Sequence, residues 1–208
     1  MITRAGDPDV WYAYDVFALK AAHPLVDYLA EECEEPLLHG TRVWQSGWLA
    51  IDWLQRHPLP QGSKVIDVGC GWGLLGIYCA RQFGSRVLSV DVDPCVGPFL
   101  DLHARINEVT VRPRYTGIAG IGARDLAGTE LLAGADICFW NELVQPLYDL
   151  VGRALEAGVP RILVADPGRE PFEKLAARCV RDFGAVVFDH GAPRPRSKGR
   201  LLWLDRSV

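Results

Sequence analysis

The sequence predicts a single-domain α/β fold, built as a doubly wound, mainly parallel sheet with helices on both faces. Short apolar runs alternate with longer amphipathic segments through most of the 208 residues, which is the order of elements in a parallel sheet with helical crossovers. A turn with three glycines follows the first of these runs, at residues 69–73. Near the end, two apolar runs follow each other with no helical segment between them. A chain of this length that is 49% hydrophobic can bury a substantial core.

The N-terminal segment is acidic, because residues 1–39 hold eight acidic and two basic residues. We expect residues 1–42 to form a helical cap or lid outside a core that spans residues 43–208. The stretch SGWLAIDWLQRH, at residues 46–57, places apolar side chains on one face of a helix, with Ser46 as the expected N-cap. This helix should pack on the sheet.

The core elements follow in pairs. Predicted strands at residues 64–69, 85–91, 135–140 and 161–166 are each followed by a predicted helix, at residues 74–84, 95–108, 143–158 and 171–184. The last two apolar runs, at residues 185–192 and 200–207, are separated only by PRPRSKG. Because a parallel connection needs a longer crossover, these runs are expected to form a hairpin with one antiparallel strand.

The segment VIDVGCGWGLLG, residues 65–76, contains two overlapping glycine patterns that indicate different cofactors. From Gly71 it reads G-x-G-x-x-G, with Asp91 twenty residues further on, which is typical of a dinucleotide-binding oxidoreductase. From Asp67 it reads D-x-G-x-G-x-G, with an acid at the end of the strand. The first register carries the strand to Gly71 and buries the Asp67 carboxylate inside it, which is costly for an unpaired charge.

The second register gives Asp67 a function. At the carboxyl end of a parallel strand its carboxylate reaches the crevice where open α/β sheets bind ligands, and there it can meet a ligand's ammonium group or order loop amides. Glycine at positions 69 and 71 lets the backbone approach a ligand closely. Asp91 ends the second predicted strand, where it can accept hydrogen bonds from both hydroxyls of an adenosine ribose, and Val92 can cover the adenine.

With these residues the chain resembles the class I methyltransferases, the Rossmann-like, seven-β-strand family that uses S-adenosylmethionine, over residues 42–208. The resemblance implies a seven-stranded sheet with a late antiparallel hairpin strand. RVWQSG, residues 42–47, is similar to the W-x-S-G segment of the seven-β-strand protein lysine methyltransferases, where the tryptophan lies by the cofactor. VADPGREPF, residues 164–172, resembles the D-P-G-R-x-x-F segment of the electron-transfer flavoprotein β-subunit lysine methyltransferases.

The narrower resemblance implies an N-methyltransferase that acts on lysine side chains of a folded protein. One departure concerns the acceptor side, because this family usually carries D-x-x-Y after its fourth strand and the chain aligns ELVQ there, with Glu142 and Gln145. A lysine amine has an ordinary pKa of about 10.4, so its proton must be removed or disfavoured before transfer. Glu142 is the candidate for that task. An equally supported interpretation is that Glu142 only stabilises the start of a helix through the helix dipole.

The predicted site therefore binds S-adenosylmethionine and no metal ion. The catalytic candidates are Asn141 and Glu142, and the cofactor-binding candidates are Trp44, Asp67, Gly69, Cys70, Gly71, Gly73, Asp91, Val92 and Trp140. Burial in the core is the alternative for the two tryptophans.

Three other functions stay open: methylation of a small amine or other metabolite, a non-catalytic module that keeps the cofactor site, and a nicotinamide-dependent oxidoreductase. A nucleic-acid partner is not expected, because NELV differs from the N-P-P-Y arrangement that holds a flipped base. The basic stretch PRPRSKGR also lacks interleaved aromatic residues.

The six cysteines show no metal-site spacing, and most are expected to be small buried thiols in a reducing compartment. No apolar run approaches the roughly 20 residues of a membrane-spanning helix, and the N-terminus lacks the order of a signal peptide. We therefore expect a cytoplasmic protein with no membrane partner, while the sequence leaves the oligomeric state open.

Overall fold

The computed structural model describes residues 7–31, 33 and 42–207, so part of the expected N-terminal cap lies outside the described residues. Its centre is a seven-stranded sheet with the strand order β5-β4-β3-β6-β7-β9-β8. The strands β5, β4, β3, β6 and β7 run parallel, whereas β9 pairs antiparallel with both β7 and β8. The doubly wound sheet and its late antiparallel hairpin strand are confirmed.

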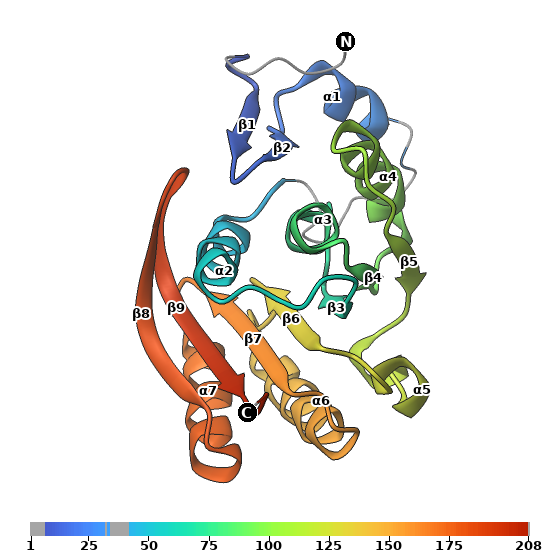
Figure 1. Ribbon diagram of the computed structural model, residues 1–208. Helices are drawn as coiled ribbons and strands as arrows, with labels where there is room; N and C mark the ends of the chain where they lie inside the picture. The colour runs from blue at the N-terminus through green and yellow to red at the C-terminus, as the bar shows by residue number, and fades with distance from the viewer. Residues whose placement is uncertain (1–6, 32, 34–41, 208) are drawn as a thin grey trace.

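Helices cover both faces of this sheet (Figure 1). The strands are β3 (Lys64–Val68), β4 (Arg86–Asp91), β5 (Arg112–Tyr115), β6 (Leu131–Ala135), β7 (Arg161–Asp166), β8 (Val186–Pro193) and β9 (Arg196–Asp205). One face carries α2 (Gln45–Arg56), α3 (Leu74–Phe83) and α4 (Gly97–Ile106), and the other carries α5 (Ala123–Leu126), α6 (Val144–Glu156) and α7 (Glu170–Phe183).

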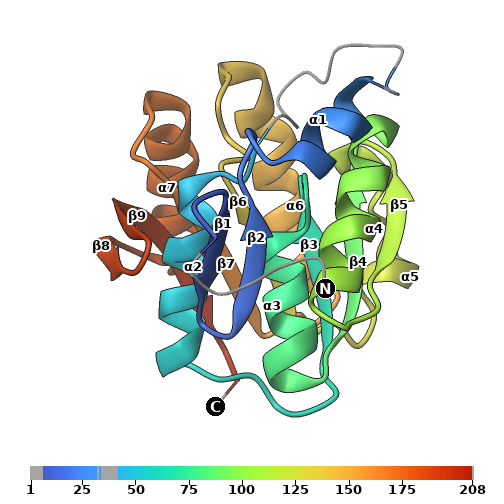
Figure 2. The same cartoon turned by 90° about the horizontal axis from the view of Figure 1, so that it is seen from above.

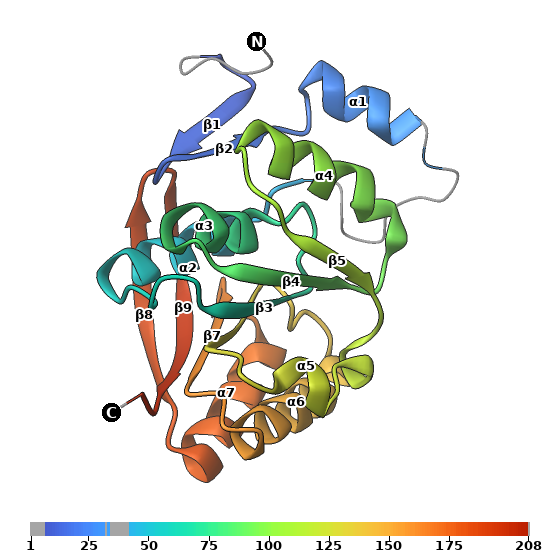
Figure 3. The ribbon, with the colours of Figure 1, turned by 45° about the vertical axis from the view of Figure 1, so that its right-hand side comes forward.

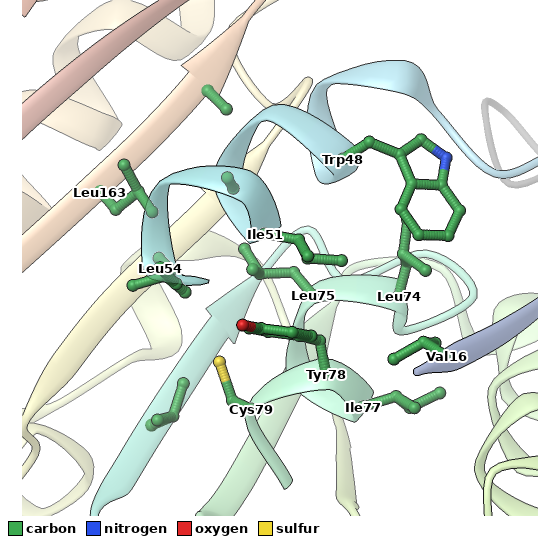
Figure 4. Packing of buried hydrophobic residues seen from close by; sticks show 14 of the residues in the cluster. Val16, Trp48, Ile51, Leu54, Leu74, Leu75, Ile77, Tyr78, Cys79 and Leu163 are labelled. Carbon is green, nitrogen blue, oxygen red and sulfur yellow. The ribbon is translucent and has the colours of Figure 1, made fainter. Parts of the chain in front are cut away.

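Both faces of the sheet are buried, since successive residues of a strand point to opposite sides. Val65 packs in the cluster that includes α2 and α3, whereas the next residue, Ile66, packs in the cluster that includes α6 and α7. Figure 4 shows the first cluster, with Ile51 of α2 beside Leu75 of α3. This packing fixes the carboxyl ends of the strands relative to the first turns of α2 and α3.

The N-terminal part is only partly helical, which differs from the expected cap. An antiparallel hairpin of β1 (Val10–Ala13) and β2 (Val16–Leu19) precedes a single helix, α1 (Pro24–Glu31). The hairpin and α1 lie over the layer of α3 and α4, away from the sheet (Figures 2 and 3). The aromatic and β-branched residues on both sides of the Tyr14–Asp15 turn favour strands over a helix.

One core strand lies earlier than predicted. The prediction placed it at residues 135–140, but β6 ends at Ala135 and the aromatic residues after it form a loop. Asp136 adopts a φ of 60°, which ends the extended backbone. A Cβ on Gly134 would lie 2.9 Å from the Val68 carbonyl oxygen, so only glycine lets β6 lie this close to β3. The short polar strand β5 was also absent from the predicted elements.

The cysteines divide into two groups. Cys79, Cys138 and Cys179 are buried free thiols, as expected for small core residues. Cys33 and Cys95 form a disulfide, so the expectation of reduced thiols is wrong for this pair. The bond links the chain beyond α1 to the short 3-10 turn η1 (Pro94–Val96). Among the helices of the described residues, none combines the length and apolar character needed to cross a bilayer.

Candidate cofactor and acceptor site

A cavity of about 490 Å³ opens at the carboxyl edge of the parallel strands. Its walls come from the ends of β3, β4 and β6, from the segment before α2 and from the loops after β5 and β7. Open α/β sheets bind ligands at this edge, and the volume is that of a small-molecule site. Eight of the nine predicted cofactor residues line it: Trp44, Asp67, Gly69, Cys70, Gly71, Asp91, Val92 and Trp140.

The three glycines of the turn have two different functions. Gly69 and Gly71 have φ angles of 61° and 50° and line the cavity. A Cβ on Gly71 would meet nothing within 4 Å, so the backbone there is open to a ligand. Gly73 is the ninth predicted residue and does not line the cavity. With a φ of 81° it begins α3, and its missing side chain makes room for Leu100 of α4.

Asp67 lies one residue before the end of β3, not at the strand terminus where we expected it. Its carboxylate is buried, and its Oδ2 accepts a hydrogen bond of 2.9 Å from the Gly76 amide in α3. Burial raises the pKa of Asp67 to about 7, the Gly76 bond opposes that rise, and the Asp91 charge adds to it. From the sequence, Asp67 could either meet a ligand's ammonium group or order the amides of the loop. The geometry favours the second function, because the carboxylate accepts the Gly76 amide.

Asp91 ends β4 and holds the glycine turn in place. Its Oδ2 accepts a hydrogen bond of 2.9 Å from the Gly71 amide, and its Oδ1 accepts one of 3.0 Å from the Asp93 amide. An ionised carboxylate has about four acceptor positions, so further acceptor capacity remains for a ligand that enters the cavity. Val92 follows with 67% of its surface exposed, which leaves an apolar side chain at the cavity wall.

An ion-pair group lies on the opposite side of the cavity, and only its link to Asp136 was not anticipated from the sequence. Arg169 donates to Asp136 Oδ1 over 2.7 Å and to Asp166 Oδ2 over 2.8 Å. Asp136 Oδ2 accepts a hydrogen bond of 3.1 Å from the Ser46 amide in the first turn of α2. Ser46 is therefore not the N-cap that we expected, because Trp44 occupies that position and Asp136 satisfies an amide of the helix.

The predicted catalytic residues do not line the cavity. Asn141 and Glu142 lie in the exposed 3-10 turn η3 (Asn141–Leu143), and Asn141 accepts a hydrogen bond of 2.9 Å from Lys174. Their neighbour Trp140 does line the cavity, with 48% of its surface exposed. The structure thus places both residues at the rim, directly after Trp140 and outside the cavity lining.

The loop after β6 brings a further acid and a further aromatic ring to the cavity. Directly after β6 the chain reads D-I-C-F, from Asp136 to Phe139, and both of these residues line the cavity. The alignment of ELVQ with the family's D-x-x-Y segment stays a prediction. Gln145, the last residue of ELVQ, donates a hydrogen bond to Asp149 on its own helix.

The cavity is rich in carboxylates. Asp67, Asp91, Asp93 and Asp136 line it, against two guanidinium groups. Arg169 is already paired with two aspartates, and Arg42 stacks on the Trp44 ring at 4.4 Å. Such a cavity suits a ligand with cationic groups and hydroxyls better than the pyrophosphate of a dinucleotide. The fold and this site together define a class I methyltransferase.

The chain belongs to the ribosomal protein L11 methyltransferase (PrmA) family, whose sequence profile matches residues 37–162. This membership overturns the oxidoreductase alternative. The chain is 33% identical to the ribosomal protein L11 methyltransferase of Thermus thermophilus, over 69% of this chain and 59% of that protein. It is 28% identical to the electron transfer flavoprotein beta subunit lysine methyltransferase of Xenopus laevis, over 62% of this chain and 52% of that protein.

A solved structure supports the fold independently. The chain matches M. capricolum TrmK, determined in complex with the cofactor product S-adenosyl-homocysteine, with a TM-score of 0.56 and 6% identity. The match covers 76% of this chain and 67% of TrmK. The chain spans about half the length of the curated relatives it matches.

Proposed function

We propose that this chain is an S-adenosylmethionine-dependent N-methyltransferase that modifies lysine side chains of a protein. The observation that carries this proposal is the carboxylate-lined cavity at the ends of β3, β4 and β6, beside the glycine turn. Two relatives support the acceptor class, since one is named for ribosomal protein L11 and the other for lysine methylation of a flavoprotein subunit.

The residues of the cavity fit S-adenosylmethionine. Asp91 keeps acceptor capacity for the ribose hydroxyls, and the exposed Val92 is placed to cover the adenine. Gly69, Cys70 and Gly71 bring the backbone to the ligand, and the open space at Gly71 admits the methionine part. When bound, the cofactor supplies a methyl group already activated by a sulfonium. The protein's task is then to orient the acceptor.

The acceptor side of the cavity is the part away from the end of β4. Asp91 and Val92 would hold the adenosine at that strand end, and the acceptor would then meet Trp44, Asp136, Phe139 and Trp140, which also line the cavity. Aromatic rings suit the alkyl chain and the cationic end of a lysine, and the Asp136 carboxylate can hold the amine. We propose that the exposed Glu142, beside Asn141 at the rim, attracts a cationic side chain toward the cavity.

A small amine is the second candidate acceptor, because the same carboxylates and rings would accept a free amine. A nucleic-acid acceptor is not proposed, since four cavity carboxylates would repel phosphates. We expect the reaction in the cytoplasm. A non-catalytic module would bind the cofactor without transferring its methyl group to any acceptor.

Label transfer tests the proposal. The purified chain is incubated with tritiated S-adenosylmethionine and, separately, with ribosomal protein L11, with the flavoprotein subunit, and with the macromolecular and small-molecule fractions of a cell extract. We expect a discrete labelled protein that yields methyl-lysine on hydrolysis, and a strong reduction of the label in Asp91→Ala. Asp101→Asn, at an exposed acid paired with Arg105 on α4, should leave it unchanged. Label confined to small molecules would favour the amine, and absence of cofactor binding in calorimetry would refute the proposal.

A further inference from the structure

We propose that Arg169 is a positioning residue for the acceptor: by bridging Asp166 and Asp136, it fixes the Asp136 carboxylate at the cavity wall where the amine enters. This inference rests on the proposed function and adds to it a role for Arg169, which also lines the cavity, through the Asp136 carboxylate. It connects the D-P-G-R segment with the loop after β6, 33 residues earlier in the chain.

The bridge is anchored on its buried side. Asp166 is fully buried at the end of β7, and its Oδ1 accepts hydrogen bonds of 2.8 Å from the amides of Gly168 and Arg169. Its Oδ2 accepts from the Arg169 guanidinium over 2.8 Å. Asp166 is thus held by its own loop, and it presents the rigid, planar guanidinium fork to Asp136.

Asp136 is held from two directions. The second guanidinium nitrogen donates to Oδ1 over 2.7 Å, and the Ser46 amide of α2 donates to Oδ2 over 3.1 Å. The side chain is only 6% exposed, yet the residue lines the cavity. One bond to each oxygen fixes the carboxylate plane and leaves acceptor positions free for an amine.

Removal of the guanidinium would leave two carboxylates facing each other in a partly buried space. Their repulsion would turn Asp136 away or favour its protonated form. Either change weakens the attraction for a cationic amine. A lysine at position 169 keeps the charge but has one ammonium group in place of the fork, so it cannot reproduce both bonds with the same geometry.

The same strand offers a matched control. At the opposite end of β7, Arg161 also bridges two carboxylates, with 2.7 Å to Glu130 and 3.3 Å to Asp205. Its side chain is 16% exposed, against 28% for Arg169. Arg161 does not line the cavity. Its loss should affect folding in a comparable way without touching the acceptor position.

Two cofactor analogues test the inference without an identified acceptor. S-adenosylhomocysteine lacks the methyl group, whereas sinefungin carries an amine-bearing carbon in place of the methylsulfonium and so places a cation toward the acceptor position. Calorimetry on the full chain gives the affinity for each, and urea unfolding reports the stability of every variant. The ratio of the two affinities measures how well the acceptor wall receives a cation.

We expect Arg169→Gln to lower the sinefungin affinity about tenfold relative to that of S-adenosylhomocysteine, which should itself change by less than about twofold. Arg169→Lys should give an intermediate ratio, and Arg161→Gln should leave the ratio unchanged. Asp136→Asn should lower the ratio as Arg169→Gln does, and the double variant should lower it no further, because both changes act through one carboxylate.

Two results would overturn the inference. If the ratio stays constant or rises in Arg169→Gln, the guanidinium serves only folding or merely offsets the charge of Asp136. If Arg161→Gln lowers the ratio equally, the effect comes from general loosening of the fold. A wild-type chain that binds neither analogue would instead refute the proposed cofactor site, which is a separate and recognisable outcome.

Discussion

The Asp67 carboxylate accepts a hydrogen bond from the Gly76 amide over 2.9 Å, and this bond ties the last part of β3 to the first turn of α3 across the glycine turn. The carboxylate is buried in the cavity wall, with only 2% of the residue exposed. The protein therefore keeps an ionisable group where its charge is poorly solvated. The hydrogen bond to Gly76 orders the glycine turn, and the buried carboxyl group makes the stability of the fold depend on pH.

Asp67→Asn is expected to remove part of the pH dependence of stability. Burial raises the pKa of Asp67 from 3.8 to about 7, so between these values the folded state holds a proton that the unfolded state has released. The free energy of unfolding should then fall as pH rises through that window, by up to about 1.4 kcal/mol per pH unit. Asparagine still accepts the Gly76 bond and does not ionise, so the variant should gain stability relative to the wild type from pH 4 to pH 7. Urea unfolding across this range measures the difference, with Asp101→Asn as the control; parallel curves would contradict the assignment.

Much of the fold follows from local patterns, and the errors lie where long-range packing decides. The strands β3, β4, β7 and β8 combine apolar runs with clear breaks, and their positions were predicted closely, whereas β9 begins four residues before the predicted run. The strand β6 was misplaced because the aromatic residues after it have a higher strand propensity than its own Leu-Leu-Ala-Gly-Ala sequence. The sequence does not show that Gly134 lies against the Val68 carbonyl, which is what fixes the strand there.

The site shows the same division. Asp67 and Gly71 could be found because they belong to one short glycine motif. Asp91 could be found because it follows Gly71 at a fixed distance of twenty residues. Asp136 could not be found in this way, since its partners Ser46 and Arg169 lie 90 and 33 residues away in the chain. Glu142 was chosen as a candidate because the predicted strand ended at residue 140, whereas β6 ends at Ala135 and Asp136 follows it directly.

Asp91→Ala is expected to weaken S-adenosylmethionine binding by roughly 1.5 to 3 kcal/mol, through the loss of charge-assisted bonds to the ribose. The structure adds a second cause, because the change also leaves the Gly71 and Asp93 amides without their acceptor. Asp91→Asn, which keeps one carbonyl oxygen, should lose less affinity. Titration calorimetry with the cofactor measures both variants. An affinity equal to that of the wild type in the alanine variant would mean that the ribose binds elsewhere.

Alanine at Gly71 and at Gly73 should separate ligand binding from folding. Both positions have a left-handed backbone, which costs an alanine about 1–2 kcal/mol. At Gly71 the added methyl group meets no atom within 4 Å but borders the cavity, so cofactor affinity should fall while stability changes little beyond that cost. At Gly73 the methyl group meets Leu100, which should lower stability by roughly a further 1–3 kcal/mol. Urea unfolding measures stability, and calorimetry with S-adenosylhomocysteine measures affinity. If Gly73→Ala lowered the affinity and Gly71→Ala did not, Gly73 and not Gly71 would contact the cofactor.

Tyr14→Phe should destabilise the junction between the N-terminal hairpin, α2 and β8. The Asp52 carboxylate of α2 accepts hydrogen bonds from the Tyr14 hydroxyl over 2.8 Å and from Arg56 over 2.7 Å, and it lies 2.9 Å from His190 Nε2 of β8. Burial and the Asp52 bond raise the pKa of Tyr14, so the hydroxyl remains a donor at neutral pH. Its removal takes one partner from a carboxylate that is 6% exposed, and we expect a loss of about 1.5 kcal/mol in the free energy of unfolding. The matched control is Tyr12→Phe, because Tyr12 donates to Asp15 in a solvent-exposed bond of the same hairpin and its loss should leave the urea midpoint unchanged. Equal effects in the two variants would show that the hairpin is not held to the core through Asp52.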